Sequence, residues 1–489
     1  MNLPFLSWSR LLLVVCLASA SSKVLAQDNN RWNHQYGTRS ALMSGAVVGG
    51  VSDSSATFYN PGVLATLKQE SLSVSANALQ YESLSVRNGA GEGKRLESDE
   101  VQVLPLLISG IQRFDSLPGH AFGYSLLTRN GSNTSFSARN DSFLDVVSLT
   151  PLGDDSFPGQ ENYIGQHSSD AKLTEYWAGL TWSYEVDSNF SVGITNYLAL
   201  RDQQRSLRES ARAINPISLN AATTDLFQRY DALNLGLLWK FGAAYQMEDV
   251  KFGLTVTTPN VHLWGDGTVE RDLTLTGFDF VSEDGSPNSL VANDRQESLD
   301  ARYNSPLSIA AGVEIDLMPK TTLGISAEWF APVGEYRVLR ARANDFVRPS
   351  GVDFEVAGSD QFLAVADSAE DVLNIGVGLE HRFTEKFNGY LGFRSDLSTA
   401  RQLDINGIQA GISNWDIYHT SIGGTYRFEN SMLALGLEYS YGSQSRELGE
   451  IDIVSPTQEG LLFGPGAAAR YRYSAIKAIL GYTYFFDVI

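Results

Sequence analysis

The residue types that most often perform catalysis or bind metals are few and scattered in this chain. Its six histidines stand at His34, His120, His167, His262, His381 and His419, and none has the His-x-x-x-His spacing that places two ligands on one helix face. No Gly-x-Ser-x-Gly motif marks a serine nucleophile. We therefore predict that the protein is not an enzyme and has no catalytic residues, metal site or cofactor, although a triad built from distant strands would leave no such spacing and stays an alternative.

The one cysteine, Cys16, lies in a short apolar run near the N-terminus. Arg10 precedes this run of residues 11–18, and Val24-Leu25-Ala26 ends in the small residue that a signal peptidase accepts. The run is too short to cross a bilayer as a helix, which needs about 20 residues. We predict that residues 1–26 are a removed signal peptide, which leaves a mature chain without disulfides, thiolate metal sites or a cysteine nucleophile.

The charge of the chain excludes one class of partner. Its formal net charge is −20, and loss of Arg10 and Lys23 with the signal changes it to −22. Such an acidic surface argues against nucleic acid as a partner.

The elements that must position any functional residue are strands. From about Ser71 apolar residues take every second place, as in Leu180-Thr-Trp182-Ser-Tyr184, with small or polar residues between them. Strands of about 10 residues with one apolar face are what a membrane barrel requires, since only helices and closed barrels satisfy every backbone group in lipid. Counting such runs predicts fourteen strands, at 71–86, 101–114, 119–130, 173–187, 190–204, 229–247, 250–264, 303–317, 321–340, 371–384, 387–397, 416–429, 431–445 and 471–487.

The connections between these strands alternate between tight turns and long joins. The joins at 131–172, 265–302 and 341–370 carry acidic, Gly and Ser residues, and we expect them to be outer loops. An even number of strands then places both chain ends in the periplasm. Aromatic residues cluster toward strand ends and suit the interfacial girdles of such a barrel rather than a soluble β-core; they are Trp177, Trp182, Trp239, Trp264, Trp329, Tyr439, Tyr441, Tyr482 and Tyr484.

Residues 27–69 differ from the rest, since they are rich in Gly, Ser and Ala with little alternation. Within them, Gly45-Ala46-Val47-Val48-Gly49-Gly50 leads to Asp53-Ser54-Ser55-Ala56-Thr57-Phe58-Tyr59-Asn60-Pro61-Gly62-Val63-Leu64-Ala65. This segment resembles the hatch of FadL-type outer-membrane transporters, which precedes a barrel of fourteen strands. Asn-Pro-Gly-Val-Leu-Ala stands where the family has Asn-Pro-Ala-Gly-Leu-Ala, so only Asn60, Pro61 and Gly62 are carried over with the neighbouring Phe58 and Tyr59.

The resemblance implies an all-β fold in three parts: a signal peptide at 1–26, a hatch in the lumen at 27–69 and a barrel at 70–489. It implies a monomeric outer-membrane channel, surrounded by outer-membrane lipids, for passive uptake of long-chain fatty acids or other hydrophobic small molecules. Phe58, Tyr59, Asn60, Pro61 and Gly62 would then gate the path.

If the cargo is a fatty acid, an inward Arg or Lys would meet its carboxylate. The candidates on or near the polar phase of their strands are Arg113, Lys240, Arg394, Arg427 and Lys477, and the alternative for each is pairing with an acidic neighbour or facing water. Two other functions stay open. A similar barrel would serve as the docking component of a protein export system, and a general porin would have a wider, water-filled lumen in place of a hatch.

Overall fold

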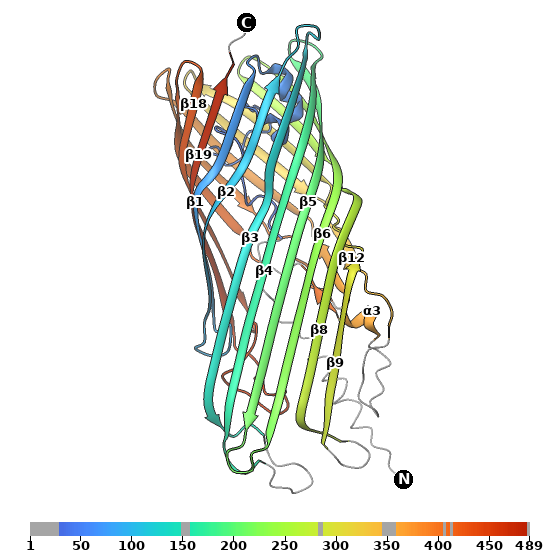
Figure 1. Ribbon diagram of the computed structural model, residues 1–489. Helices are drawn as coiled ribbons and strands as arrows, with labels where there is room; N and C mark the ends of the chain where they lie inside the picture. Colours follow the sequence, from blue (N-terminus) through green and yellow to red (C-terminus); the bar gives the residue numbers. More distant parts are fainter. Residues whose placement is uncertain are drawn as a thin grey trace.

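The computed structural model describes residues 29–147, 157–281, 287–344, 358–403, 407–410 and 414–486, so the predicted signal at 1–26 lies outside the described residues. Within that part of the chain, no helix is long and apolar enough to cross a membrane. The main element is a sheet that closes on itself (Figure 1). Its strands are β1 (Ser71–Arg87), β2 (Leu96–Gln112), β3 (His120–Leu144), β4 (Glu161–Glu185), β5 (Phe190–Ile214), β6 (Ala221–Gln246), β7 (Val250–Thr257), β10 (Ser308–Met318), β11 (Thr321–Phe330), β14 (Val372–Arg382), β15 (Phe387–Asp396), β17 (Ile417–Arg427), β18 (Ser431–Arg446) and β19 (Ala469–Phe485).

These fourteen strands form one antiparallel ring, in which β1 pairs with β19 and closes the barrel. The predicted fold class is confirmed. β8 (Val261–Val281) continues the line of β7 beside β6 after a break at Pro259, which has no N–H to donate, and β9 (Pro287–Leu299) pairs with β8.

The predicted loops at 131–172 and 265–302 are wrong, because most of each is strand. β3 runs on to Leu144 and β4 begins at Glu161, while β8 and β9 occupy the second region. The predicted strand 321–340 is two elements, since β12 (Val333–Leu339) leaves the barrel to pair with β13 (Val365–Ala369) in a small sheet that includes β16 (Ile408–Gln409). In the third region, 341–370, β13 follows the helix α3 (Ser359–Phe362), and residues 345–357 lie outside the described residues.

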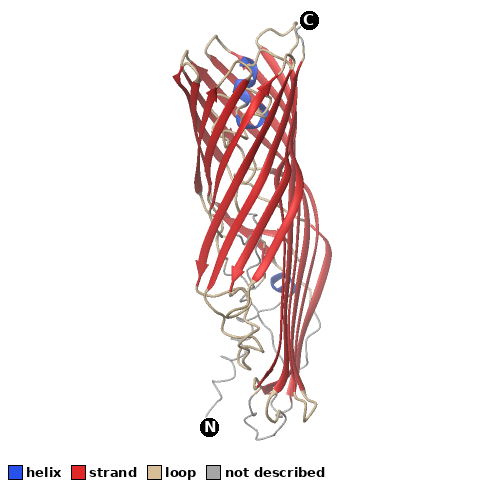
Figure 2. Cartoon of the chain, turned by 90° about the vertical axis from the view of Figure 1, so that its left-hand side faces the viewer, coloured by secondary structure: helices blue, strands red, loops and turns tan. Residues whose placement is uncertain are grey.

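The long strands β3 to β6 and β8 project far beyond the shorter wall of β10 to β19 (Figures 1 and 2). We call the projecting part the extension: residues 131–144, 161–174, 202–214, 221–232, 265–281 and β9. At about 3.3 Å per residue, the 14 residues of β3 alone reach roughly 45 Å. Apolar side chains on the inner face of the extension, among them Tyr163, Leu226 and Leu273, pack in one cluster with residues of α3, β12, β13 and β16.

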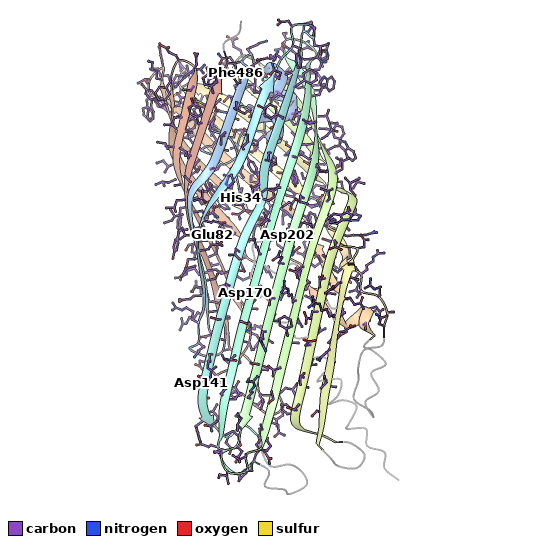
Figure 3. All side chains as sticks on the ribbon, in the orientation of Figure 1. His34, Glu82, Asp141, Asp170, Asp202 and Phe486 are labelled. Carbon is purple, nitrogen blue, oxygen red and sulfur yellow. The ribbon has the colours of Figure 1, made fainter. Side chains whose placement is uncertain are left out.

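The outward faces of the strands show where lipid contact ends. Tyr176 and Leu200 face outward side by side on β4 and β5. Four residues farther along β4 and β5, the outward-facing row across four neighbouring strands consists of Lys172, Gln204, Asp231 and Thr268. Polar outward residues continue along the extension, where Asp202, Asp170 and Asp141 lie progressively farther from Phe486 at the opposite end (Figure 3). Water, not lipid, therefore surrounds the extension, and the apolar/polar alternation that marked the shorter strands fades there.

The ladder between β2 and β3 is interrupted. Its paired residues run from Leu107–Leu127 to Gln112–Phe122, whereas β3 continues for 17 residues past Leu127. Pro105 lies where the β1–β2 register shifts, opposite the step from Ser75 to Ala76, which marks a β-bulge in β2 at this proline. Beyond this bulge, isolated side-chain hydrogen bonds join β2 and β3 in place of the backbone ladder. One of them runs from Thr128 Oγ1 to the Pro105 carbonyl (2.6 Å).

A charge on the lipid-facing band should destabilise the barrel far more than a charge on the extension. Leu180, 69% exposed and near the middle of the apolar band on β4, should cost about 2–4 kcal/mol when replaced by Arg. Gln204→Arg, on the polar row, should stay within about 0.5 kcal/mol of the wild type. Equilibrium unfolding of both variants in lipid vesicles measures the difference, and equal losses would contradict the membrane boundary drawn here.

Candidate channel site

The N-terminal segment lies inside the barrel at the end where the C-terminus emerges (Figure 1). We call residues 29–66 the plug; nearly all of its residues are buried, and it ends in α2 (Ala56–Tyr59) and the 3-10 helix η1 (Pro61–Thr66). Asn60 joins the two helices, because its Oδ1 accepts a hydrogen bond from the Gly62 N–H (3.0 Å) at the start of η1. Its Nδ2 donates to the carbonyls of Val48 in the plug and Ala243 on β6, both at 3.0 Å. One side chain thus fixes the turn, the fold of the plug and its place on the wall.

Aromatic rings fill the space beside this turn. Phe58 packs edge-on against Tyr36, with ring centroids 4.6 Å apart, and against Tyr59 at 5.2 Å. The Tyr59 hydroxyl donates to Gln35 Oε1 (2.7 Å) and accepts from the Tyr36 N–H (2.9 Å). Burial raises the pKa of Tyr59 well above its ordinary value, so the phenol remains a donor at any physiological pH.

The wall meets the plug through glycines. A methyl group added to any of several wall glycines would strike the plug, often its backbone, and nine of these glycines lie on nine different strands. We call this set the glycine belt: Gly193, Gly242, Gly253, Gly312, Gly324, Gly378, Gly392, Gly436 and Gly481. Several members are direct cross-strand partners, including Gly193 with Gly242 and Gly324 with Gly378. The bare backbone of the wall is therefore the surface on which the plug rests.

Ion pairs fix the plug at two further places. Arg39 of the plug binds Glu314 on β10 (2.8 Å) and Glu380 on β14 (2.6 Å), the two neighbours of β11, and Lys251 also binds Glu314 (2.6 Å). Two connected cavities of about 520 and 570 Å³ open beside Arg39 and Ser52 at this end of the lumen.

The second anchor includes two of the predicted basic residues. Arg394 and Lys477 both bind Glu438, at 2.5 and 3.2 Å, and both donate to the backbone carbonyl of Asn33 in the plug. Nearby, burial lowers the pKa of His34 well below its ordinary value, so this ring is neutral.

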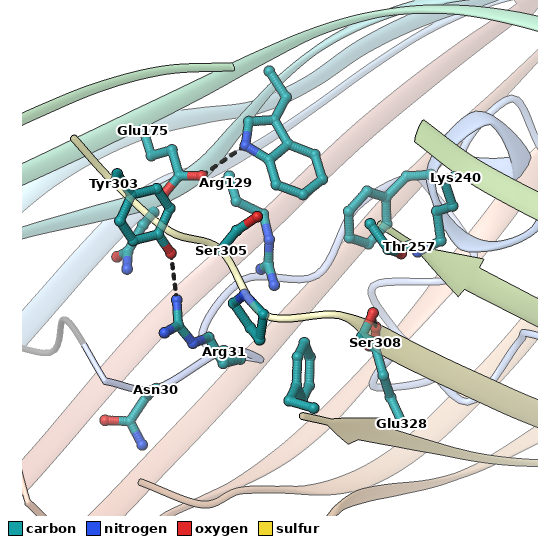
Figure 4. A pocket seen from close by; sticks show the side chains of 15 residues that line it. Asn30, Arg31, Arg129, Glu175, Lys240, Thr257, Tyr303, Ser305, Ser308 and Glu328 are labelled. Carbon is teal, nitrogen blue, oxygen red and sulfur yellow. Dashed lines mark hydrogen bonds between the residues drawn. The ribbon is translucent and has the colours of Figure 1, made fainter. Parts of the chain in front are cut away.

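A third cavity is lined in part by Phe58 of the plug, and Figure 4 shows its surroundings. Its volume is about 40 Å³, and its lining combines aromatic rings with charged groups. Phe58, Trp177, Tyr303 and Phe330 supply the rings, and Arg31, Arg129, Glu175, Lys240 and Glu328 supply the charges. They come from the plug, β3, β4, β6, β11 and the segment before β10, which only the closed barrel brings together.

Lys240 is the predicted basic residue that reaches this cavity. Its side chain is 4% exposed, and its Nζ lies 4.4 Å from the centroid of the Phe58 ring. Among the described residues it has neither a hydrogen-bond nor an ion-pair partner. The Arg129 guanidinium lies 5.8 Å from the same ring and 5.5 Å from Trp177, so two cations flank one aromatic residue of the plug.

The remaining predicted basic residues lie elsewhere. Arg113 binds the carbonyls of Ala65 and Leu67 where the plug ends, and Arg427 contacts Gln69 and the Phe485 ring. The sequence therefore named five cations that the structure divides among the cavity, the Glu438 anchor and the end of the plug.

Sequence reasoning missed most of the cavity lining. It placed Trp177 in the interfacial girdle, which is wrong: Trp177 is 7% exposed and donates to Glu175 Oε1 inside the lumen (2.7 Å). The phase of β4 carried the signal, since Trp177 stands out of step with the outward residues Leu180, Trp182 and Tyr184. Arg129, Tyr303 and Glu328 had no comparable signal. No group of histidine, cysteine and carboxylate side chains among the described residues is arranged to hold a metal ion.

A closed fourteen-stranded barrel with its N-terminal segment inside defines a class of fold, the plugged outer-membrane β-barrel. Solved structures that share it include two toluene transporters and a FadL homologue. The toluene transporter TodX of Pseudomonas putida superposes with a TM-score of 0.52 at 14% identity, over 93% of this chain and 99% of TodX. The Ralstonia pickettii toluene transporter TbuX gives 0.53 at 14% identity, over 93% and 99%. A Pseudomonas aeruginosa FadL homologue gives 0.53 at 14% identity, over 96% and 100%.

At these identities the likeness is one of fold. No protein-family model and no curated protein sequence matches the chain.

Filling one position of the glycine belt should displace the plug. A methyl group at Gly242 would meet Asn60 and Pro61, so Gly242→Ala should cost about 1–3 kcal/mol and speed hydrogen exchange at residues 45–66. Gly334→Ala, where nothing lies within 4 Å, is the matched control. Unchanged exchange in the Gly242 variant would show that the plug does not depend on this contact.

Proposed function

We propose that the protein is an outer-membrane channel for passive uptake of long-chain fatty acids or other hydrophobic small molecules, gated by the plug. The observation that carries this proposal is the aromatic cavity, which is closed on one side by Phe58 of the plug. Apolar ligands gain roughly 25 cal/mol per Å² of surface removed from water, so a few aromatic rings suffice to retain them. The shared fold with two toluene transporters and a FadL homologue supports the same cargo class.

The cavity as it stands is too small for such cargo. A cavity of about 150 Å³ lined by apolar side chains holds one benzene molecule, whereas this one measures about 40 Å³. Passage therefore requires Phe58 to move. Tyr59, Asn60, Pro61 and Gly62 set the position of Phe58 through the turn between α2 and η1, and we assign gating to these five residues.

The head group of an acidic cargo would meet Lys240. An anion beside its ammonium would supply the partner that the buried cation lacks, with Arg129 as the second cation. Arg394 and Lys477 are engaged by Glu438, and Arg113 and Arg427 lie at the end of the plug, so we assign these four residues only a weaker role in carboxylate binding.

The interrupted β2–β3 ladder offers a sideways exit. Leu104 packs against Gly131 across the interruption, 3.3 Å from the site of a glycine Cβ, and small movements of this leucine would open the wall. Cargo would then leave without crossing the polar cavities beside Arg39.

We further propose a signal peptide at 1–26, a hatch domain at 27–69 that contains the plug, and a barrel domain at 70–489. The barrel acts as a monomer. The tight turns and both chain ends face the periplasm, and the extension faces the outside.

A general porin fits less well, because the plug fills the lumen. A docking role in protein export would use the outer face of the extension, and the cavity gives no reason to prefer it.

Cargo is identified by organic extraction of the purified detergent-solubilised protein and mass spectrometry of what co-purifies. The wild type should carry fatty acids or other single-chain amphiphiles, and Asn60→Ala with Pro61→Ala should lose or change them. An empty lumen that conducts ions in planar bilayers would support the porin or docking function instead.

Replacing Lys240 separates acidic from neutral cargo. Lys240→Met should weaken fatty-acid binding by roughly tenfold to a hundredfold, since a hydrogen bond to a charged group contributes about 1.5–3 kcal/mol. Binding of an uncharged hydrocarbon should change little. Arg208→Gln, which removes the same charge from the outward face of the extension, is the control. An equal loss for both ligands in Lys240→Met would contradict the head-group assignment.

The lateral exit is tested by closing it. The proposed mature chain has no cysteine, so Leu104→Cys with Gly131→Cys introduces the only thiols. A short bifunctional thiol reagent should abolish cargo uptake in this variant while leaving either single variant active. Full uptake after cross-linking would exclude the β2–β3 route.

A further inference from the structure

Three arginines form a patch on the outer wall of the barrel, where β1 pairs with β19. Arg87 ends β1, and Arg470 and Arg472 begin β19. All three are exposed on the outward face, and Arg87 and Arg470 are direct cross-strand partners. Arg472 lies opposite Ser443 on β18 and Ser85 on β1. We call Arg87, Arg470 and Arg472 the arginine patch.

No carboxylate neutralises the patch. Within the described part of the chain, none of its three members forms an ion pair. Glu97, which lies opposite Ser85 in the row of Arg472, binds Arg95 (2.9 Å). Like charges directly opposite each other destabilise a sheet. In a chain with a net charge of −20, folding alone gives no reason to gather three arginines there.

The patch stands at the edge of the lipid-facing band. Along β19, Tyr484, Tyr482, Leu480 and Ile476 face outward and are exposed, and Arg472 and Arg470 follow after Ser474. Four residues separate Ile476 from Arg472, which on a tilted strand is roughly 10 Å toward water. The headgroup zone of one leaflet is about 5–8 Å thick, and arginine side chains extend several ångströms toward such a zone.

The neighbouring strand carries the aromatic girdle to the same level. Tyr439 and Tyr441 of β18 are exposed, and both Arg470 and Arg472 lie near the Tyr441 hydroxyl. Girdle tyrosines mark the membrane interface, so the arginines face the layer where phosphates lie. Arginine binds phosphate oxygens through paired N–H donors, and adjacent arginines suit a headgroup with more than one phosphate.

We propose that the arginine patch binds the phosphates of a phosphorylated glycolipid, lipid A, in the outer leaflet. The extension projects from the same outer edge of the lipid-facing band. A lipid bound by the arginine patch would therefore lie in the outer leaflet beside the shorter strands of the barrel. This inference rests on the proposed outward direction of the extension and not on the cargo, so failure of either can be told from failure of the other.

The test is native mass spectrometry of the full chain in detergent micelles, titrated with diphosphoryl lipid A. Arg87→Gln, Arg470→Gln and Arg472→Gln combined should weaken binding by roughly tenfold or more. The control triple removes the same charge from the outward face of the extension: Arg139→Gln, Arg208→Gln and Arg229→Gln. A third variant combines Arg87→Lys, Arg470→Lys and Arg472→Lys. It keeps the charge but lacks the paired N–H donors, so it should bind more weakly than the wild type and more tightly than the Gln triple.

Three further arms identify the source of the phosphate. Monophosphoryl lipid A should bind more weakly than the diphosphoryl form. Phosphatidylglycerol should bind the wild type and the patch variant alike, and inorganic phosphate should not compete. Equal binding of diphosphoryl lipid A to the patch and control triples would overturn the proposal, as would patch-dependent binding of phosphatidylglycerol or competition by free phosphate.

Discussion

The fit between the plug and the wall is the constraint on which the rest of the structure depends. A folded segment inside a fourteen-stranded ring leaves no room for side chains on both surfaces, and the chain resolves this with glycine on the wall. The glycine belt runs through nine strands and receives the plug backbone directly, so that Gly49 and Gly312 approach each other as bare backbone. Interiors are close-packed, and a single added methyl group at such a contact has nowhere to go.

Buried charges determine where the plug sits on this surface. Arg39 bridges two strands through Glu314 and Glu380, and Arg394 with Lys477 grips the plug through Glu438 and Asn33. Buried ion pairs add little net stability because desolvation offsets most of their attraction. Their geometry is strict, however, and a misplaced plug would leave these charges unpaired. The ion pairs thus specify position, while the apolar and glycine contacts provide most of the packing.

The sequence predicted the ring well because lipid imposes a simple rule on it. Every second residue of a spanning strand must be apolar, and this alternation predicted all fourteen strands. The N-terminal segment in the lumen was predicted from its resemblance to the FadL-type hatch. Beyond the membrane the rule lapses: outward residues such as Asp202 and Asp231 match the polar inner phase, so long strands in water resembled loops. The cavity was out of reach for another reason. Arg129, Lys240 and Glu328 are neighbours only across a closed lumen, and no periodicity along one strand records that.

The aromatic cavity beside Phe58 is a place where the close packing of the plug against the wall is interrupted. Among the described residues Lys240 is buried without a hydrogen-bond or ion-pair partner, whereas Arg39 and Arg394 are paired with carboxylates. The ring beside Lys240 is Phe58 of the plug itself. A buried cation that meets only an aromatic face retains most of its desolvation penalty. An anionic ligand would remove that penalty beside Phe58, the side chain that moves in the proposed gating. The binding free energy of such a ligand would then act next to Phe58. In the proposed gating, close packing keeps the resting channel closed, and an anionic cargo would favour its opening.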